Sequence, residues 1–306
     1  MNSQSEKNTQ FVYKIGLNHI FLMICFSVIA LLYGFISNFS LEAKIESLVD
    51  SNLKKVRRCP ISYKKLTLSY IFPGISFRNL ELDGACFKGS DGLMLNNVET
   101  SLGFPSFSPL GPSLNTTIKD KYSLVNISSA HSVSSHKIRI ESNKLSSKTF
   151  DSLLNDFKVE GLFKLTSVSE LTKKNLKSLL INLKSNNLVI PSQTINSFDI
   201  PKLDVKNFSL IAELSGKDNL NIKKFVVGDE RSPLRANIEG KVTLNTRRIQ
   251  NSELDLNIVV KFSEQFLESF GIISLFLDSS KQDENGFYTI NVKGPLSRPK
   301  HTVIKK

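Results

Sequence analysis

Residues 203–214 read LDVKNFSLIAEL, and residues 234–244 read LRANIEGKVTL. In both stretches apolar residues recur at every second position with polar residues between them, the pattern of a β-strand with one buried and one wet face. Residues 220–227 (LNIKKFVV) and 254–260 (LDLNIVV) repeat the pattern. Because such short strands follow one another closely, they predict a meander of antiparallel hairpins. We therefore expect one broad sheet with a single apolar face.

The apolar face of such a sheet has to be covered by a second layer, by its own curvature or by a ligand. An acyl groove would be lined by the alternating apolar side chains of these strands, here called the groove residues: Phe208, Leu210, Phe225, Val227, Ile238, Val242, Leu256 and Ile258. The alternative is an ordinary core, covered by an amphipathic helix that the spacing predicts from about Ser263 to Leu277. The sequence leaves both interpretations open.

The composition is that of a folded protein, with 306 residues, 40% hydrophobic and 22% charged. The net charge of +12 is spread over short basic pairs along the chain. There is no Trp, and basic residues are not interleaved with aromatic ones, so we expect no nucleic-acid partner. Solvated strand faces, with some attraction to an anionic membrane surface, explain the charge better.

An apolar segment near the N-terminus predicts membrane insertion. Residues 1–14 are polar and are expected to form a cytoplasmic tail, whereas residues 15–39 contain no Asp, Glu, Lys or Arg. A helix of that length can cross a hydrocarbon core of roughly 30 Å. A cleaved signal peptide is the alternative, but the run ends in Ser37-Asn38-Phe39-Ser40 rather than in a small-x-small cleavage site, which favours an uncleaved transmembrane helix. Residues 40–58 follow as a juxtamembrane amphipathic helix.

Two of the three cysteines, Cys59 and Cys86, bracket one small β-unit. They are candidates for a disulfide in an oxidising compartment, with two unrelated buried thiols as the alternative. The disulfide would favour a location outside the cytoplasm for residues 59–300, the predicted β-rich domain. Residues 301–306 are expected to be a basic tail.

The rest of residues 59–300 is predicted piece by piece. Alternation between Leu66 and Leu82 indicates a hairpin, and further strands are expected at Leu93–Leu102 and Leu176–Ile190. Residues 113–147 support only weak strands. Residues 103–112 (GFPSFSPLGP) predict a turn or an exposed loop, and Thr149–Phe157 predicts a short helix. The last predicted strand is Phe287–Val292.

Little in the sequence indicates catalysis. The four histidines occur in no metal-binding motif, and there is no nucleophile elbow, P-loop or dinucleotide fingerprint. His131 and His136 lie in a Ser-rich stretch, SSAHSVSSHK, that is typical of a polar surface loop. We therefore expect no catalytic residue, no cofactor and no metal site.

The order of several segments resembles the type II secretion system protein N family, which is itself similar to AsmA and TamB-type periplasmic proteins. The segments are LTLSYIFPGISFRNLELDG at 66–84, IEGKVTLN at 238–245, NSELDLNIVVKFS at 251–263 and GFYTINVKGPLSRPK at 286–300, after a single N-terminal anchor. The resemblance spans most of residues 15–300, although residues 104–150 match poorly and the cysteine pair has no assigned counterpart. It implies an inner-membrane protein with a periplasmic, curved, groove-like sheet. It supplies no catalytic residues.

Together these features predict a mainly β protein: an N-terminal transmembrane helix, then a periplasmic antiparallel, curved, groove-like sheet with one or two amphipathic helices. The expected function is that of a non-enzymatic, inner-membrane-anchored component of a type II secretion system, which contacts other secretion proteins. The alternative is a lipid-binding or lipid-transfer protein with phospholipid in the apolar groove. An enzyme is the least favoured hypothesis.

Overall fold

The chain divides into two compact units, Met1–Asn52 and Leu53–Lys306. The computed structural model describes residues 17–38, 41–53, 56, 59–69, 73–87, 92–149, 151, 154, 157–172, 175–195, 198–216, 218–245, 248–270 and 279–304.

The described residues of the first unit lie in two helices, α1 (Leu17–Asn38) and α2 (Leu41–Leu53). In α1 the large apolar side chains of Phe26 and Leu31 are exposed. Within the described part of the chain, no helix combines the length and the apolarity that crossing a bilayer requires. The ends of the predicted membrane segment, residues 15, 16 and 39, lie outside the described residues.

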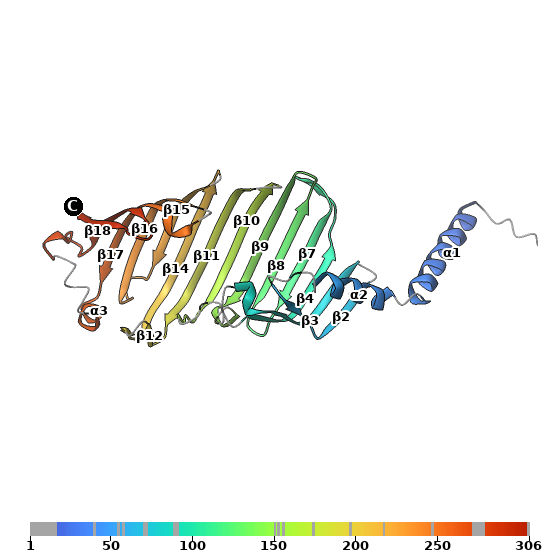
Figure 1. Cartoon of the computed structure of the whole chain (residues 1–306), viewed down its shortest axis with the longest axis horizontal. Helices are drawn as coiled ribbons and strands as arrows, with labels where there is room; N and C mark the ends of the chain where they lie inside the picture. The colour runs from blue at the N-terminus through green and yellow to red at the C-terminus, as the bar shows by residue number, and fades with distance from the viewer. Residues whose placement is uncertain are drawn as a thin grey trace, which may run out of the picture. The chain divides into compact units, whose positions relative to one another are not determined.

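The second unit is built on one antiparallel sheet of 15 strands (Figure 1). From β3 onward each strand pairs with the next main-sheet strand along the chain, while β1 and β2 both pair with β3. The prediction of a mainly β protein with one antiparallel sheet is therefore confirmed. The strands are β1 (Ile61–Ser62), β2 (Lys65–Ser69), β3 (Gly74–Leu82), β4 (Leu93–Leu102), β7 (Ser113–Lys119), β8 (Leu124–His131), β9 (Ser135–Ser146), β10 (Leu162–Thr172), β11 (Leu176–Ile190), β14 (Leu203–Ser215), β15 (Asn219–Val227), β16 (Leu234–Thr243), β17 (Glu253–Phe262), β18 (Tyr288–Pro295) and β19 (Lys300–Ile304).

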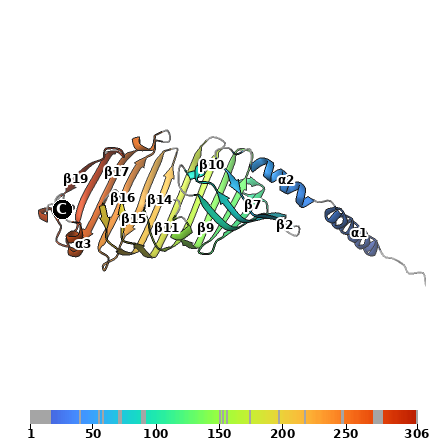
Figure 2. The same cartoon turned by 60° about the horizontal axis from the view of Figure 1, so that its bottom comes forward.

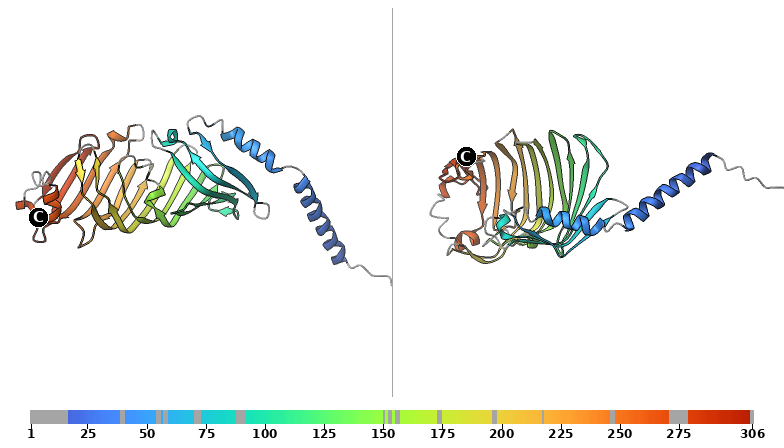
Figure 3. Two further views of the ribbon diagram at one scale, coloured as in Figure 1. Left: turned by 90° about the horizontal axis from the view of Figure 1, so that it is seen from below. Right: turned by 45° about the vertical axis from the view of Figure 1, so that its right-hand side comes forward.

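Two short hairpins branch from the main sheet. They are β5 (Ser106–Phe107) with β6 (Leu110–Gly111), and β12 (Gln193–Ile195) with β13 (Phe198–Ile200). The main sheet is twisted, as adjacent strands of L-residues require, and it is curled along its length (Figures 2 and 3).

The two faces of the sheet differ in chemistry because residues directly opposite each other on paired strands share a face. On one face a row of charged and amide side chains runs through Glu213, Asn221, Lys241, Asp255 and Lys293. Lys293 forms an ion pair of 3.3 Å with Asp255 in this row. The other face is apolar, so each strand separates a polar surface from an apolar one.

A buried core lies where β11 ends and β14 begins. Leu188, Leu203 and Val205 are buried there against Phe266 of the helix α3 (Glu264–Ser269). The Ser263 side chain caps α3 by accepting the backbone N–H of Phe266 at 3.1 Å. Phe270, the residue that follows α3, also packs against this cluster. The helix therefore has a defined start and attaches to the sheet through aromatic side chains.

Several sequence predictions need correction. Residues 300–304, expected in part to be a tail, form the edge strand β19, because Val303 pairs with Ile290 and extends the apolar face. Residues 103–112, expected to be a turn or an exposed loop, contain the short β5–β6 hairpin, in which Phe107 pairs with Leu110. The helix expected to end near Leu277 ends at Ser269, and residues 271–278 lie outside the described residues.

The helix predicted at Thr149–Phe157 falls largely on undescribed positions. Residues 147–149 form a 3-10 turn, and residues 150, 152, 153, 155 and 156 lie outside the described part. The weak strands predicted within 113–147 are longer than expected, as β7, β8 and β9 show.

The turn between β15 and β16 contains a carboxylate whose ionisation stabilises it. Asp229 Oδ1 accepts the backbone N–H of Arg231 at 2.9 Å and the Ser232 hydroxyl at 3.0 Å. These bonds, the backbone one first, hold the pKa of Asp229 below its ordinary value of 3.8. The stabilisation is therefore complete above pH 3.8 and is lost as the pH falls through the lowered folded-state pKa.

We expect carboxyl-carbon NMR to give Asp229 a titration midpoint below 3.8 in the folded chain. A Ser232→Ala variant, which removes one of the two donors, should raise that midpoint toward the ordinary value. A midpoint at or above 3.8 in the unmodified chain would contradict the assigned hydrogen bonds.

Candidate functional site: the apolar face of the sheet

The eight groove residues lie on one face of the sheet. Phe208 is opposite Val227, and Leu210 is opposite Phe225, which in turn is opposite Ile238. The same face continues through Ile258, Leu256 and Val242 on β16 and β17. All eight side chains are half-buried. They are thus neither a sealed core nor a set of isolated surface residues.

The apolar face extends well beyond the four strands in which the sequence predicted it. One line of directly paired residues, here called the central row, crosses fourteen strands from β2 to β19. It consists of Leu68, Ile75, Thr100, Thr116, Ile127, Ile140, Ser167, Ile181, Ala212, Ile222, Gly240, Leu256, Val292 and His301. At a strand spacing of about 4.8 Å the row is roughly 60 Å long.

Side-chain size varies along the central row. Small residues occupy every second strand of its middle part, at Ser167, Ala212 and Gly240, and larger ones such as Leu210 and Ile238 flank them in the next row. Gly240 has a φ of 143°, and a Cβ there would overlap the carbonyl oxygen of Asp255, so glycine is required. The smallest side chains of the central row therefore lie beside larger side chains of the next row.

The cover on this face is local. Phe266 of α3 contacts the buried cluster at one end of the strands, together with the half-buried Phe208 and Val227. Apart from the main sheet, the described residues of this unit form only two short hairpins, α3 and single-turn 3-10 helices. These described elements include no second layer over the central row, and its members other than Ala212 and His301 stay half-buried.

Aromatic rings fill the covered end. Phe208 makes edge-to-face contacts with Phe163 and Phe225, with ring centroids 6.0 and 5.6 Å apart. Such contacts stabilise the face by about 0.5–1.5 kcal/mol each beyond the area they bury. Phe208 and Phe225 therefore have a structural role in addition to their candidate role as groove residues.

The described histidines do not assemble into a metal site. His131 and His136 pair across β8 and β9, with their Nδ1 atoms 3.1 Å apart, and His131 Nε2 lies 2.9 Å from the Ser129 hydroxyl. His301 is on β19, opposite Val292. Among the described residues, no three His, Cys, Asp or Glu side chains are grouped so that they could hold a metal ion.

The two candidate cysteines form a disulfide. Cys59, just before β1, is bonded to Cys86 in the 3-10 helix Gly84–Phe87 that follows β3, and their Cα atoms are 4.4 Å apart. The bond ties together the two ends of the first hairpin unit. Cys25 of α1 is a free, exposed thiol.

Comparisons with models of protein families, with curated proteins and with solved structures find no match to this chain. The candidate site therefore has to be interpreted from its own geometry.

Proposed function

We propose that the apolar face of this sheet binds the acyl chains of lipid, and that the protein is a non-enzymatic, membrane-tethered lipid-binding protein. The observation that carries the proposal is the continuous central row with its half-buried side chains. Water contact at so many aliphatic groups is unfavourable by about 25 cal/mol per Å². An elongated apolar ligand laid across the strands would remove that contact.

Acyl chains suit this face better than a compact ligand does. The central row is roughly 60 Å long, is apolar over most of its length and has no charged member. Its Ser and Thr hydroxyls are few, and Thr100 and Thr116 bond to each other at 3.0 Å. A ligand that binds there gains hydrophobic contact with little directional hydrogen bonding.

The proposed location of the sheet is outside the cytoplasm, next to the inner membrane. The apolar composition of residues 15–39 supports an anchor there, and the Cys59–Cys86 disulfide supports an oxidising compartment. We propose that the curled sheet is a periplasmic groove.

A matched pair of neighbouring residues tests lipid binding. Ile258 and Val259 are consecutive on β17 and both half-buried, but Ile258 faces Ile238 on the apolar face whereas Val259 faces Asn237 on the polar one. Ile258→Asp places a charge where the acyl chain would lie, so we expect binding of a fluorescent long-chain fatty acid to the full chain to weaken roughly ten-fold or more.

Val259→Asp is the control, and it should leave fatty-acid affinity within about two-fold while keeping the same circular dichroism spectrum. Phospholipid that copurifies after gentle extraction should be lost from Ile258→Asp alone. Equal affinities for both variants, or no binding by the unmodified chain, would show that the face is an ordinary core and would refute the proposal.

A role in type II secretion stays a prediction that rests on the order of the resembling segments. The two roles predict different effects of deleting the gene. Loss of secreted proteins after deletion, with unchanged outer-membrane lipid, would favour secretion; normal secretion with altered lipid would favour lipid binding. Neighbouring genes for secretion components would also favour the first role.

A further inference from the structure

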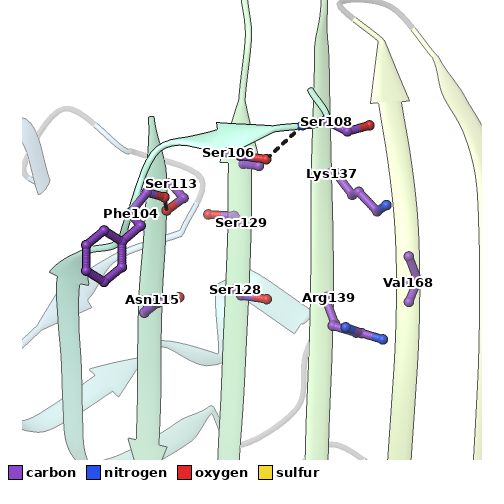
Figure 4. A pocket seen from close by; sticks show the side chains of 11 residues that line it. Phe104, Ser106, Ser108, Ser113, Asn115, Ser128, Ser129, Lys137, Arg139 and Val168 are labelled. Atoms are coloured by element: carbon purple, nitrogen blue, oxygen red, sulfur yellow. Dashed lines mark hydrogen bonds between the residues drawn. The ribbon is translucent and has the colours of Figure 1, made fainter. Parts of the chain in front are cut away.

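The polar face of the sheet carries a separate feature near the ends of β7 to β10. The β5–β6 hairpin folds over these strands, and its Ser106 and Ser108 line one side of an open pocket of about 570 Å³ (Figure 4). Ser113 donates its hydroxyl to the Phe104 carbonyl, and the Gly103 N–H bonds to the Ser113 carbonyl at 2.9 Å. The hairpin is thus fixed to β7 by hydrogen bonds. The pocket lining includes Ser128, Lys137 and Arg139.

Three apolar side chains project into solvent from this hairpin segment. Phe104 is 92% exposed, Phe107 is 91% exposed and Leu110 is 73% exposed. Phe107 and Leu110 are directly opposite each other in the hairpin, so they form one projection. We call these three residues the prong. Side chains of this size are normally buried, and a group of them on a short hairpin indicates a surface to which they bind.

Positive charge lines the same pocket as Phe104. Lys137 and Arg139 point from β9 on the same face, toward the pocket (Figure 4). Arg139 is paired with Glu141 at 3.1 Å, but Glu170, which is opposite Lys137, forms its ion pair with Lys177 instead. Lys137 itself has no ion pair with any described residue.

We propose that the prong inserts into the interface of an anionic phospholipid bilayer, with Lys137 and Arg139 at the level of the phosphates. Exposed Phe and Leu beside basic residues are the combination that binds peripheral proteins to membranes. Three side chains are few compared with the roughly 20–30 residues per partner of a stable protein interface. A bilayer requires no such number of contacts, because its lipids rearrange around the side chains that enter it.

This proposal is independent of acyl binding, because it uses the opposite face of the sheet. It also supplies a second attachment besides the N-terminal segment. A sheet held at two points would keep its apolar face at a fixed orientation to the bilayer.

The lack of Trp in the chain allows a direct test. Phe107→Trp introduces a single indole at the prong, and Ile249→Trp introduces one at a position that is 67% exposed between β16 and β17. Each full-length variant is mixed with vesicles of phosphatidylcholine alone or of phosphatidylcholine with phosphatidylglycerol. We expect a blue shift of indole emission for Phe107→Trp with the anionic vesicles, and none for Ile249→Trp.

Two further changes test the roles of the prong and of the charge. In the Phe107→Trp chain, the vesicle-dependent shift reports the apparent affinity for anionic vesicles. Lys137→Gln should lower that affinity roughly five-fold, and high salt should do the same. Replacing Phe104 and Leu110 by Ser should lower the apparent vesicle affinity roughly ten-fold or more. A Phe107→Trp spectrum unchanged by vesicles would overturn the proposal and leave a protein as the occupant of the prong. Equal shifts at positions 107 and 249, or with and without phosphatidylglycerol, would overturn it as well.

Discussion

Reduction of the Cys59–Cys86 disulfide is expected to lower the free energy of unfolding of the first strands by about 3 to 4 kcal/mol. The bond closes a loop of sequence separation 27, and a cross-link of that length removes much of the conformational freedom of the unfolded chain. The loop contains all of β1, β2 and β3, which form one end of the sheet. Because a terminal hairpin has neighbours on one side only, the loss should be concentrated there.

Urea unfolding with and without reductant, combined with hydrogen exchange of the β3 amides, measures the effect. A Cys25→Ser variant should respond to reductant as the unmodified chain does, because Cys25 is a free thiol. A Cys59→Ser/Cys86→Ser variant should already be destabilised and insensitive to reductant. Identical unfolding curves for the oxidised and reduced forms would contradict the predicted contribution.

Two strands could be predicted from the sequence to the residue. Leu93–Leu102 and Leu176–Ile190 have the predicted bounds, and the hairpin between Leu66 and Leu82 is present. In Leu176–Ile190, Leu179, Ile181 and Leu183 recur at every second position, so the period of two is visible without any knowledge of the partner strands.

The middle strands were harder to predict because hydroxyl side chains occupy their apolar face. Thr116 of β7 stands in the central row, and Ser129 of β8 lies opposite Leu114 and Ile138 on the same face. Thr favours strands for its branched Cβ, but a hydropathy pattern counts it as polar. The bounds of β7 to β9 therefore depend on pairing with neighbouring strands, which local sequence does not record.

The groove residues could be predicted as one face, but not the extent of their cover. Whether a helix lies across a sheet or only at its end depends on contacts between residues far apart in the sequence. Here Phe266 packs against Leu188, Leu203 and Val205, a cluster that local periodicity cannot predict. The prong cannot be predicted for the same reason: GFPSFSPLGP indicates turns, and nothing in it predicts that the hairpin folds over the polar face.

Phe266→Ala should be among the most destabilising single substitutions in the second unit, by about 3–5 kcal/mol if the surroundings cannot collapse into the cavity. Phe266 is 7% exposed, and its ring centroid is 5.3 Å from that of Phe262 and 4.6 Å from that of Phe270. The ring also joins the helix to the buried cluster, so its removal breaks the attachment of a six-residue helix that cannot be stable alone. Urea unfolding measures the change.

Phe104→Ala is the matched control, since it makes the same change at a side chain that is 92% exposed and should alter stability by less than about 0.5 kcal/mol.

Fatty-acid binding by Phe266→Ala distinguishes a purely structural role of the aromatic end of the apolar face from a role in acyl binding. If α3 covers only one end of the apolar face, Phe266→Ala should lower stability yet leave acyl affinity the same or higher, because the central row is intact. If acyl affinity fell together with stability, the aromatic end of the face would itself be part of the lipid site.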